Sequence, residues 1–236
     1  MKIKQIFALC VALFAAIPAF SDDYPTISPT ATYIDSSQKE HIEQTGASIS
    51  EQAPLTVRFD ANPENTAGYI VNYQWEVFLE ADTVPDIVRY DEWMELTFTT
   101  AGTKTVRVTA TFTDTDGTQT SMTSDNFRIT ISESKLEFPN AFSPNGDGIN
   151  DTYKAKEGYQ SIVEFEATIF NRWGQKIYSW DDPSGEWDGT FNGKPVKEGT
   201  FFVYVKAKGA DGHEYKIRRD VNLLRGYTDS SSSSRP

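Results

Sequence analysis

Residues 105–112 read TVRVTATF, and every second side chain in this stretch is apolar. Successive side chains of a β-strand point to opposite faces, so this pattern indicates a strand with one buried face. The same period of two recurs at residues 55–59, 127–131, 163–169, 201–207 and 221–223. Helical periodicity is nearly absent. The sequence therefore predicts an all-β fold.

Residue pairs that favour tight turns separate these stretches: Ala101-Gly102, Asp116-Gly117, Asn145-Gly146, Asp188-Gly189, Asn192-Gly193 and Asp211-Gly212. Asn-Gly and Asp-Gly supply the positive φ angles of tight hairpins. Many short strands at this spacing favour sandwiches over an α/β enzyme. We expect two Ig-like antiparallel β-sandwiches in tandem, at residues 26–134 and 136–227, with a short polar link at 132–135.

The beginning of the chain has the order of a secretory signal peptide. Lys2 and Lys4 precede an apolar run at residues 6–17, and small residues and an acidic pair follow it. The run is shorter than the roughly 20 residues that cross a bilayer. We expect a signal peptide at residues 1–21 that is cleaved, no transmembrane segment in the mature chain, and no remaining cysteine, because Cys10 lies in the signal. The serine-rich end, residues 228–236, is expected to be disordered.

Charge is unevenly distributed between the two halves. Residues 22–135 hold 7 Lys and Arg against 19 Asp and Glu, whereas residues 136–227 hold 12 against 14. Nucleic acids and anionic lipids require neutralisation by Lys and Arg, so the acidic front half disfavours both as partners. The simplest interpretation of this charge is solubility outside the cell.

The front half carries three strand motifs in a recognisable order. Residues 54–59 read PLTVRF, residues 73–75 read YQW, and residues 97–108 read TFTTAGTKTVRV. This order resembles a PKD-type Ig-like domain. Such domains often carry a W-x-F-G-D-G turn after the tryptophan, whereas an insertion at residues 80–93 replaces it here. Any binding role tied to that turn is therefore in doubt.

Aromatic residues of the front half have two predicted roles. Trp75 lies in mid-strand and is expected to pack in the core between two sheets. Tyr90 and Trp93 lie in the acidic insertion and are candidate surface aromatics, which would offer rings to a surface glycan or protein ligand. Asp82-Thr83-Val84 matches a short O-glycosylation pattern of Bacteroidota, which makes Thr83 a weak candidate for glycosylation. An unmodified threonine is the simpler interpretation.

The back half carries a longer ordered set of motifs. Residues 138–153 read FPNAFSPNGDGINDTY, residues 169–178 read IFNRWGQKIY, and WDGT, NGK, EGTFFVY and DVNLLR begin at residues 187, 192, 198 and 220. Together they resemble the gliding motility-associated C-terminal domain, the type B sorting domain of the type IX secretion system. The residues that carry the resemblance are Pro139, Asn140, Phe142, Pro144, Asn145, Gly146, Asp147, Gly148, Asn150, Asp151, Asn171, Arg172, Trp173, Gly174, Trp187, Asp188, Gly189 and Gly199.

This resemblance implies a small β-sandwich that an outer-membrane translocon and its shuttle components recognise. It implies export through the periplasm to the cell surface, the outer membrane or the medium, often with removal of the domain. The residues also have a structural interpretation. Residues 171–174 lie between two alternating stretches and predict a turn whose tryptophan can cover the end of the sandwich. Asp188 is suited to accept backbone N–H groups of its own turn.

An oxygen-rich loop leaves two alternatives open. Asn145, Asp147, Asn150 and Asp151 offer oxygen atoms within seven residues, as Ca²⁺ prefers. The glutamate that completes an EF-hand is absent at its expected place. Either the side chains bind their own loop backbone or they hold a structural Ca²⁺. No other cofactor is expected.

Candidate catalytic residues are few. His41 and His213 are the only histidines, neither has a nucleophile motif nearby, and both are expected to be solvated. Acidic pairs such as Asp91-Glu92 and Asp181-Asp182 suit a solvated surface. We therefore expect a non-enzymatic protein that displays a binding or adhesion module. A component of the export or envelope-signalling machinery that keeps its C-terminal domain is the alternative, and a small glycan hydrolase a remote one.

Overall fold

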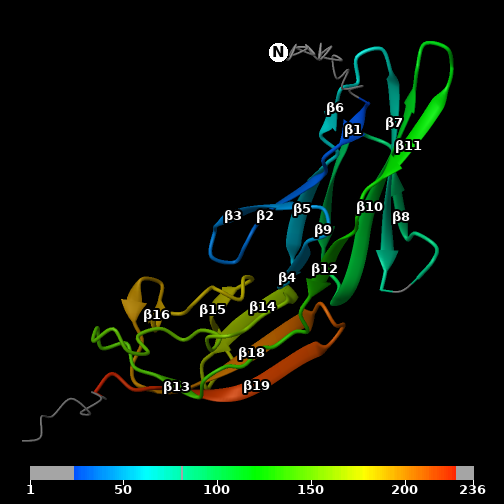
Figure 1. The fold of residues 1–236 in the computed structure, drawn as a ribbon. Helices are drawn as coiled ribbons and strands as arrows, with labels where there is room; N and C mark the ends of the chain where they lie inside the picture. Colours follow the sequence, from blue (N-terminus) through cyan, green and yellow to red (C-terminus); the bar gives the residue numbers. More distant parts are fainter. Residues whose placement is uncertain (1–23, 81, 227–236) are drawn as a thin grey trace, which may run out of the picture.

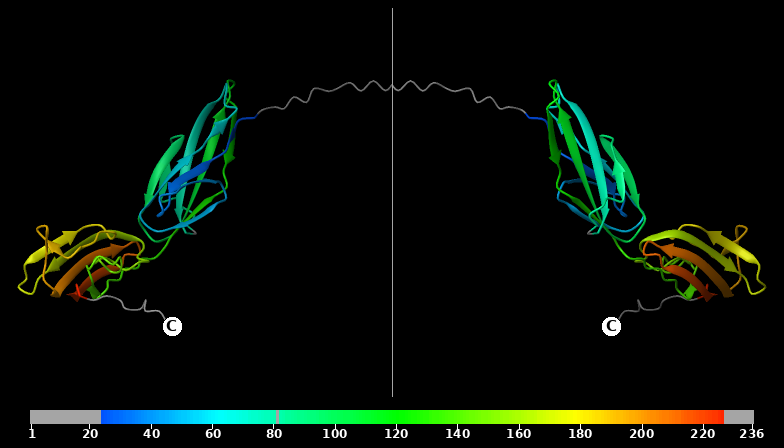
Figure 2. Two further views of the ribbon diagram at one scale, coloured as in Figure 1. Left: turned by 90° about the vertical axis from the view of Figure 1, so that its left-hand side faces the viewer. Right: turned by 90° about the vertical axis from the view of Figure 1, so that its right-hand side faces the viewer.

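The computed structural model describes residues 24–80 and 82–226, and all regular elements in this part are β-strands. The predicted all-β class is therefore confirmed. The strands form two bodies that lie end to end along the chain (Figure 1; Figure 2). The predicted signal peptide at 1–21 and the serine-rich end at 228–236 lie outside the described residues. Among the described residues, no helix is long and apolar enough to cross a membrane.

The front body consists of two facing sheets. One sheet has four antiparallel strands in the order β3(Glu40–Gln44), β2(Thr30–Ile34), β5(Leu55–Asp60) and β9(Trp93–Phe98). The other has the order β4(Ser48–Glu51), β12(Phe127–Ile131), β10(Gly102–Thr113), β7(Ile70–Leu79) and β8(Ile87–Arg89), with β11(Gln119–Thr123) also on β10. A short pair, β1(Thr26–Ile27) and β6(Pro63–Glu64), stands apart from both sheets.

The core of the front body lies between these sheets and follows the alternation of the sequence. The predicted apolar face of β10 is buried, and Trp75 on β7 is fully buried, as expected. Its indole ring lies 5.9 Å from the ring of Phe59 on β5, and its Nε1 donates to the carbonyl of Asp91 at 3.1 Å. The buried indole thus joins the two sheets and has its polar atom satisfied.

The back body has one full sheet and a thinner second layer. The sheet order is β13(Ala141–Phe142), β19(Glu214–Leu223), β18(Gly199–Gly209), β14(Ile162–Phe170) and β15(Lys176–Trp180), with β13 parallel to β19. Its inner face is covered by the irregular stretches around residues 136–155 and 187, beside the small hairpin β16(Thr190–Phe191)–β17(Lys194–Pro195). These irregular stretches carry most of the sequence motifs of the back half.

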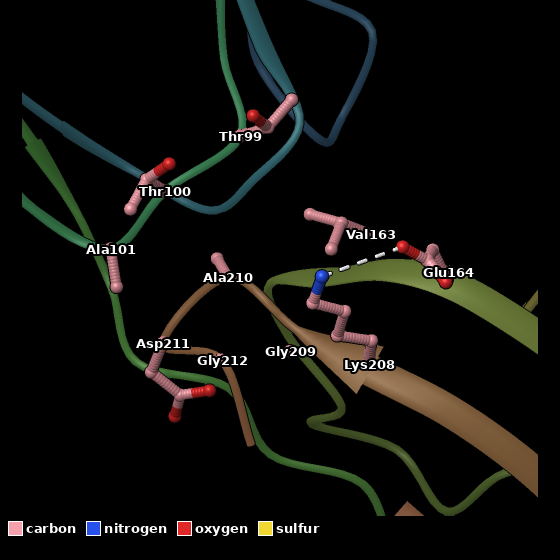
Figure 3. A pocket seen from close by; sticks show the side chains of 10 residues that line it. All are labelled: Thr99, Thr100, Ala101, Val163, Glu164, Lys208, Gly209, Ala210, Asp211 and Gly212. Atoms are coloured by element: carbon pink, nitrogen blue, oxygen red, sulfur yellow. Dashed lines mark ion pairs between the residues drawn. The ribbon is translucent and has the colours of Figure 1, made fainter. Parts of the chain in front are cut away.

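The two bodies meet in a junction that contains both hydrogen bonds and apolar packing. Ser161 is 1 % exposed; its Oγ accepts the N–H of Ala53 at 3.1 Å and lies 2.8 Å from Ser132 Oγ. The N–H of Ala101 donates to the carbonyl of Ala210 at 2.9 Å, and Ala210 packs against the front core. A hollow of about 570 Å³ opens beside these contacts, and the cross-strand pair Lys208–Glu164, 3.7 Å apart, lies on its back-body side (Figure 3).

The link between the bodies is hydrogen-bonded to both of them, and on the front side the N–H of Ser132 donates to the carbonyl of Glu51 at 3.0 Å. The Ser134 hydroxyl donates to Asp211 at 2.8 Å, and the backbones of Lys135 and Gln160 exchange two hydrogen bonds of 3.0 Å. A Cβ on Gly209 would lie 2.0 Å from Ser134 Oγ, so only glycine lets the link approach β18 this closely. The junction is therefore a packed interface and not a loose tether.

Candidate functional site

The oxygen-rich loop of the back body is closed by its own side chains. Asp151 Oδ1 accepts the N–H groups of Asn145 and Gly146 at 3.0 and 2.7 Å, and its Oδ2 accepts that of Gly148 at 2.8 Å. These hydrogen bonds stabilise the carboxylate and lower the pKa of Asp151. The loop thus wraps around one carboxylate.

The same geometry bears on the predicted Ca²⁺ site. Asn145 Oδ1 accepts the N–H of Asp147, and Asp147 Oδ1 accepts that of Ile149. Side-chain oxygens of Asn145, Asp147 and Asp151 therefore accept hydrogen bonds from the loop's own backbone. This arrangement favours the alternative of a loop bound to itself over a structural Ca²⁺. No cluster of three or more acidic, histidine or cysteine side chains suited to a metal occurs in the described chain.

Arg225 joins three segments of the back body, two of which belong to the sequence motifs. Its guanidinium donates to the carbonyls of Gly189 at 2.9 Å, Pro144 at 3.2 Å and Val196 at 3.3 Å. A Cβ on Gly189 would approach Arg225, Pro144 and Leu223 to within 3.2 Å. Sequence reasoning quoted Arg225 only as the end of a motif and missed this role, because carbonyl partners leave no signal in the sequence.

An aromatic cluster stands behind these loops. Tyr153 and Trp187 are fully buried, their backbones form an isolated bridge, and Phe142 lies between their rings. Tyr153 donates its hydroxyl to the carbonyl of Pro139 at 3.0 Å, and burial raises its pKa. Trp187 Nε1 donates to the carbonyl of Thr190 at 2.8 Å, while Asp188 accepts the N–H of Thr190, as its turn predicted. Most motif residues therefore build the second layer of the domain.

The motif at residues 171–174 is a turn, as predicted, but its tryptophan does not cover the sandwich end. Asn171 Oδ1 accepts the N–H groups of Trp173 and Gln175, and Gly174 has a φ of +80°. Trp173 is 76 % exposed at the tip of the β14–β15 hairpin, with the Arg172 guanidinium 4.5 Å from its ring centroid. The prediction for Trp173 was wrong because the hairpin extends beyond the core that its ring would have covered.

Trp173 instead borders a surface hollow of about 460 Å³. The hairpin tip forms one wall and residues 196–202 form the other, including Gly199 with its φ of +146°. The structure thus divides the predicted site residues into two groups. Asn171, Arg172, Trp173 and Gly199 line the hollow, whereas the loop of 139–151 and the turn of 187–189 hold the domain together behind it.

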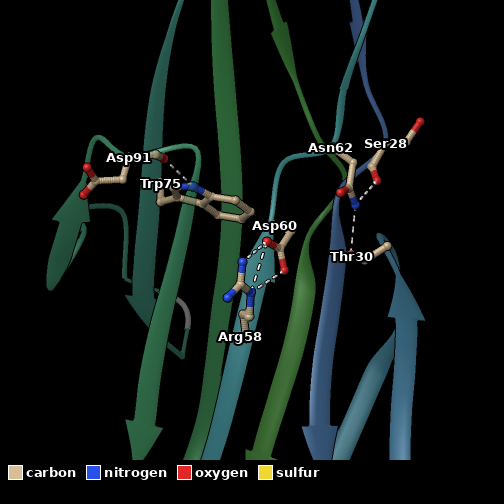
Figure 4. A network of polar contacts seen from close by, with 7 residues as sticks. All are labelled: Ser28, Thr30, Arg58, Asp60, Asn62, Trp75 and Asp91. Carbon is tan, nitrogen blue, oxygen red and sulfur yellow. Dashed lines mark hydrogen bonds and ion pairs between the residues drawn. The ribbon is translucent and has the colours of Figure 1, made fainter.

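The front body presents a different surface. Trp93 is 49 % exposed and is the first residue of β9, not part of an insertion, and Arg58 lies 4.3 Å from its ring centroid. Arg58 also binds Asp60 through two nitrogens (Figure 4). Tyr90 is 70 % exposed, and Thr83 is exposed in the loop before β8. These residues lie apart from any hollow described above.

The histidines form no catalytic arrangement in the described chain. His41 is not solvated as predicted: it is half-buried, stacks on Tyr33 opposite it in the β2–β3 hairpin, and lies 2.9 Å from Asp35 Oδ2. His213 is exposed, and its backbone N–H rather than its ring binds Asp211. The Ser134 hydroxyl donates directly to Asp211. A Ser–His–Asp triad needs the histidine ring between the serine and the aspartate, so these three residues do not form one.

Comparison with known families assigns the back body. Residues 136–218 match the model of the type IX secretion signal domain, CHU_C. The C-terminal domain is a type IX secretion signal domain. This domain directs the protein to the cell surface or the extracellular space, so the protein is a cargo of type IX secretion. The resemblance found in the motifs of the back half is thereby confirmed.

Solved structures with partial likeness to the whole chain are distant. Fibronectin(III)-like modules of CbhA from Clostridium thermocellum share 14 % identity, with 81 % of this chain and 95 % of that chain covered and a TM-score of 0.23. Latent PorU from Porphyromonas gingivalis shares 12 %, with 85 % and 20 % covered and a TM-score of 0.27. A Bacteroides ovatus SGBP-B bound to a mixed-linkage heptasaccharide shares 15 %, with 86 % and 48 % covered and a TM-score of 0.25. These scores are too low to relate functions, and no curated protein matches the chain.

Proposed function

We propose that this protein is a non-enzymatic type IX cargo in which the front Ig-like body is a binding or adhesion module. In this proposal the secretion signal domain is engaged by the translocon and its outer-membrane shuttle components. The observation that carries it is the match over residues 136–218, and four of the motif residues in this range, Asn171, Arg172, Trp173 and Gly199, line one hollow.

The surface of the front body supports a glycan or protein ligand. Trp93, Arg58 and Asp60 lie on the solvent face of the sheet β3–β2–β5–β9. Arg58 lies over one face of the indole, and the exposed parts of Trp93 and of Tyr90, three residues before it, are accessible to a ligand. Thr83, exposed in its loop, is accessible to a glycosyltransferase.

Fractionation of a bacterium that has a type IX system tests this proposal. The full chain should reach the cell surface or the medium, and a chain without residues 136–226 should stay in the periplasm in protease-resistant form. Equal surface display of the shortened chain would refute the assignment of the export role to the C-terminal domain.

A second candidate function is favoured by the junction between the bodies. Because the link at 132–135 is hydrogen-bonded to both bodies, an endoprotease cannot draw it into an extended conformation without opening the junction. This protection suits a component of the export or envelope-signalling machinery that keeps its C-terminal domain. Mass spectrometry of the mature protein distinguishes the two: loss of residues 136–226 supports ordinary cargo, and their retention in the envelope supports the second role.

A further inference from the structure

The outer face of the secretion signal domain carries exposed aromatic rings beside arginines. Phe202 and Tyr204 alternate with the buried Val203 and Val205 on β18, so they point away from the core. In the sheet register Phe202 lies between Phe170 and Asp220, and Tyr204 lies between Thr168 and Arg218. We name Phe170, Arg172, Trp173, Phe202, Tyr204 and Arg218 the arginine–aromatic surface.

Two hollows make this surface continuous. The hollow at the hairpin tip includes Arg172, Trp173 and Phe202, and a second one of about 430 Å³ includes Phe170, Phe202 and Arg218. Phe202 borders both and is 42 % exposed. Successive side chains of a strand point to opposite faces. Phe201 packs in the core, so Phe202 points to solvent, where core packing does not require an aromatic ring.

The two arginines of this surface, and Lys206 beside it, make cation–π contacts with aromatic rings. Arg172 stacks on Trp173, while the Arg218 guanidinium lies 5.0 Å and Lys206 Nζ 5.4 Å from the Tyr204 ring centroid. Ion pairs in the described part of this domain join Lys154, Lys156, Lys208 and Lys216 to glutamates. Arg172, Arg218 and Lys206 take part in none of them. The chain has a formal net charge of −12, yet these three cations have no acidic partner within the described domain. They are therefore available to bind an anionic group of another molecule.

Two acidic groups border the hollows, and neither forms an ion pair with Arg172 or Arg218 in the described part of the domain. Glu198 borders the hollow at the hairpin tip, and its Oε1 accepts the N–H of Gly226 at 2.8 Å. Asp220 borders the second hollow beside Phe202. The surface thus combines exposed rings, free guanidinium forks and concave relief, which is the composition of protein–protein hot spots.

We propose that the arginine–aromatic surface is where the secretion signal domain docks on an acidic, apolar segment of a protein of the type IX machinery. Guanidinium forks bind carboxylates in pairs, and the hollows accept apolar side chains between the rings. A protein is favoured over an anionic membrane because the front body holds 7 basic against 19 acidic residues in 22–135 and is repelled by such a membrane. This inference rests on the proposed engagement of the domain by the export machinery.

Export of full-length variants tests the surface. Arg172→Glu with Arg218→Glu should lower the exported fraction about tenfold or more, with periplasmic accumulation, because reversal of charge opposes an acidic partner. Trp173→Ala should lower it several-fold. Lys154→Glu with Lys156→Glu is the charge-matched control and should be exported normally.

Each other outcome has a distinct meaning. If the melting temperature of the purified double variant falls, Arg172→Ala with Arg218→Ala repeats the test without new carboxylates. Normal export of the folded arginine variants overturns the surface even if removal of 136–226 blocks export, whereas normal export without 136–226 overturns the proposed function itself. Arginine-dependent sedimentation with phosphatidylglycerol vesicles, but not with phosphatidylcholine vesicles, would assign the surface to a membrane. An arginine-dependent dimer of the purified protein would assign it to a second copy, and either result overturns the proposal.

Discussion

The two bodies of this protein close their cores in different ways. The front body places two sheets face to face, so alternating apolar side chains suffice to fill the space between them. The back body covers one sheet with irregular segments, and their backbone groups must be satisfied by particular side chains such as Arg225, Asp151 and Asp188. The difference explains why the back half carries a dense set of motifs and the front half a generic pattern.

The largest effect is expected from removing the buried indole of each body. Trp187→Ala and Trp75→Ala should each cost about 3–5 kcal/mol, because each ring is fully buried. The comparison predicts that Trp187→Ala unfolds the secretion signal domain and blocks export, whereas Trp75→Ala lowers the unfolding temperature of the front body. Calorimetry of the full chain, with export measured in parallel, checks this. If the single variant Trp75→Ala also lost export, the stability of the front body would be required for export, and the two bodies would not act independently.

Arg225→Ala should have the next largest effect, about 2–3 kcal/mol, because three carbonyls lose a charged donor. Arg225→Lys should recover little, since an ammonium cannot reach three divergent carbonyls at once. The control is Arg89→Ala in the front body, an exposed arginine whose one hydrogen bond to the described residues is with the carbonyl of Val88, and it should cost less than about 0.5 kcal/mol. Urea denaturation measures both, and equal costs would contradict the role of Arg225.

Gly209→Ala should cost about 1–2 kcal/mol by pushing Ser134 away from β18. Its more specific consequence is cleavage of the link at 132–135 by trypsin after Lys135, which the intact junction should resist. Gly226→Ala is the matched control, because a Cβ there lies no closer than 3.8 Å to Glu198. If limited proteolysis cleaves the wild-type link as fast as that of Gly209→Ala, the junction does not protect it.

The smallest effect is expected from acid. Hydrogen bonds from backbone or hydroxyl groups lower the pKa values of Asp151, Asp182 and Asp211 in the back body, and of Asp35 in the front body. A carboxyl whose pKa is lower in the folded than in the unfolded state stabilises the fold above about pH 4, and this contribution is lost as the pH falls. Urea denaturation between neutral pH and pH 3 should therefore show that the back body loses stability first.

Asp151→Asn should flatten that pH dependence, because the amide cannot act as the shared anionic acceptor of three N–H groups. Asp35→Asn, in the front body, serves as the control and should leave the pH profile of the back body unchanged. A steeper loss in the front body would contradict the assignment to the back body.

Local patterns in the sequence were sufficient for the all-β class, for the burial of Trp75 and for the secretion signal domain, because alternation, turn residues and motif order depend on neighbours along the chain. They were insufficient for the exposure of Trp173, the pairing of His41 with Asp35, and the carbonyl contacts of Arg225. The same holds for the junction at Ser161, which depends on residues 29 and 108 positions away. Contacts of that kind are decided only when distant strands pack, since no local preference specifies which backbone group a side chain will meet.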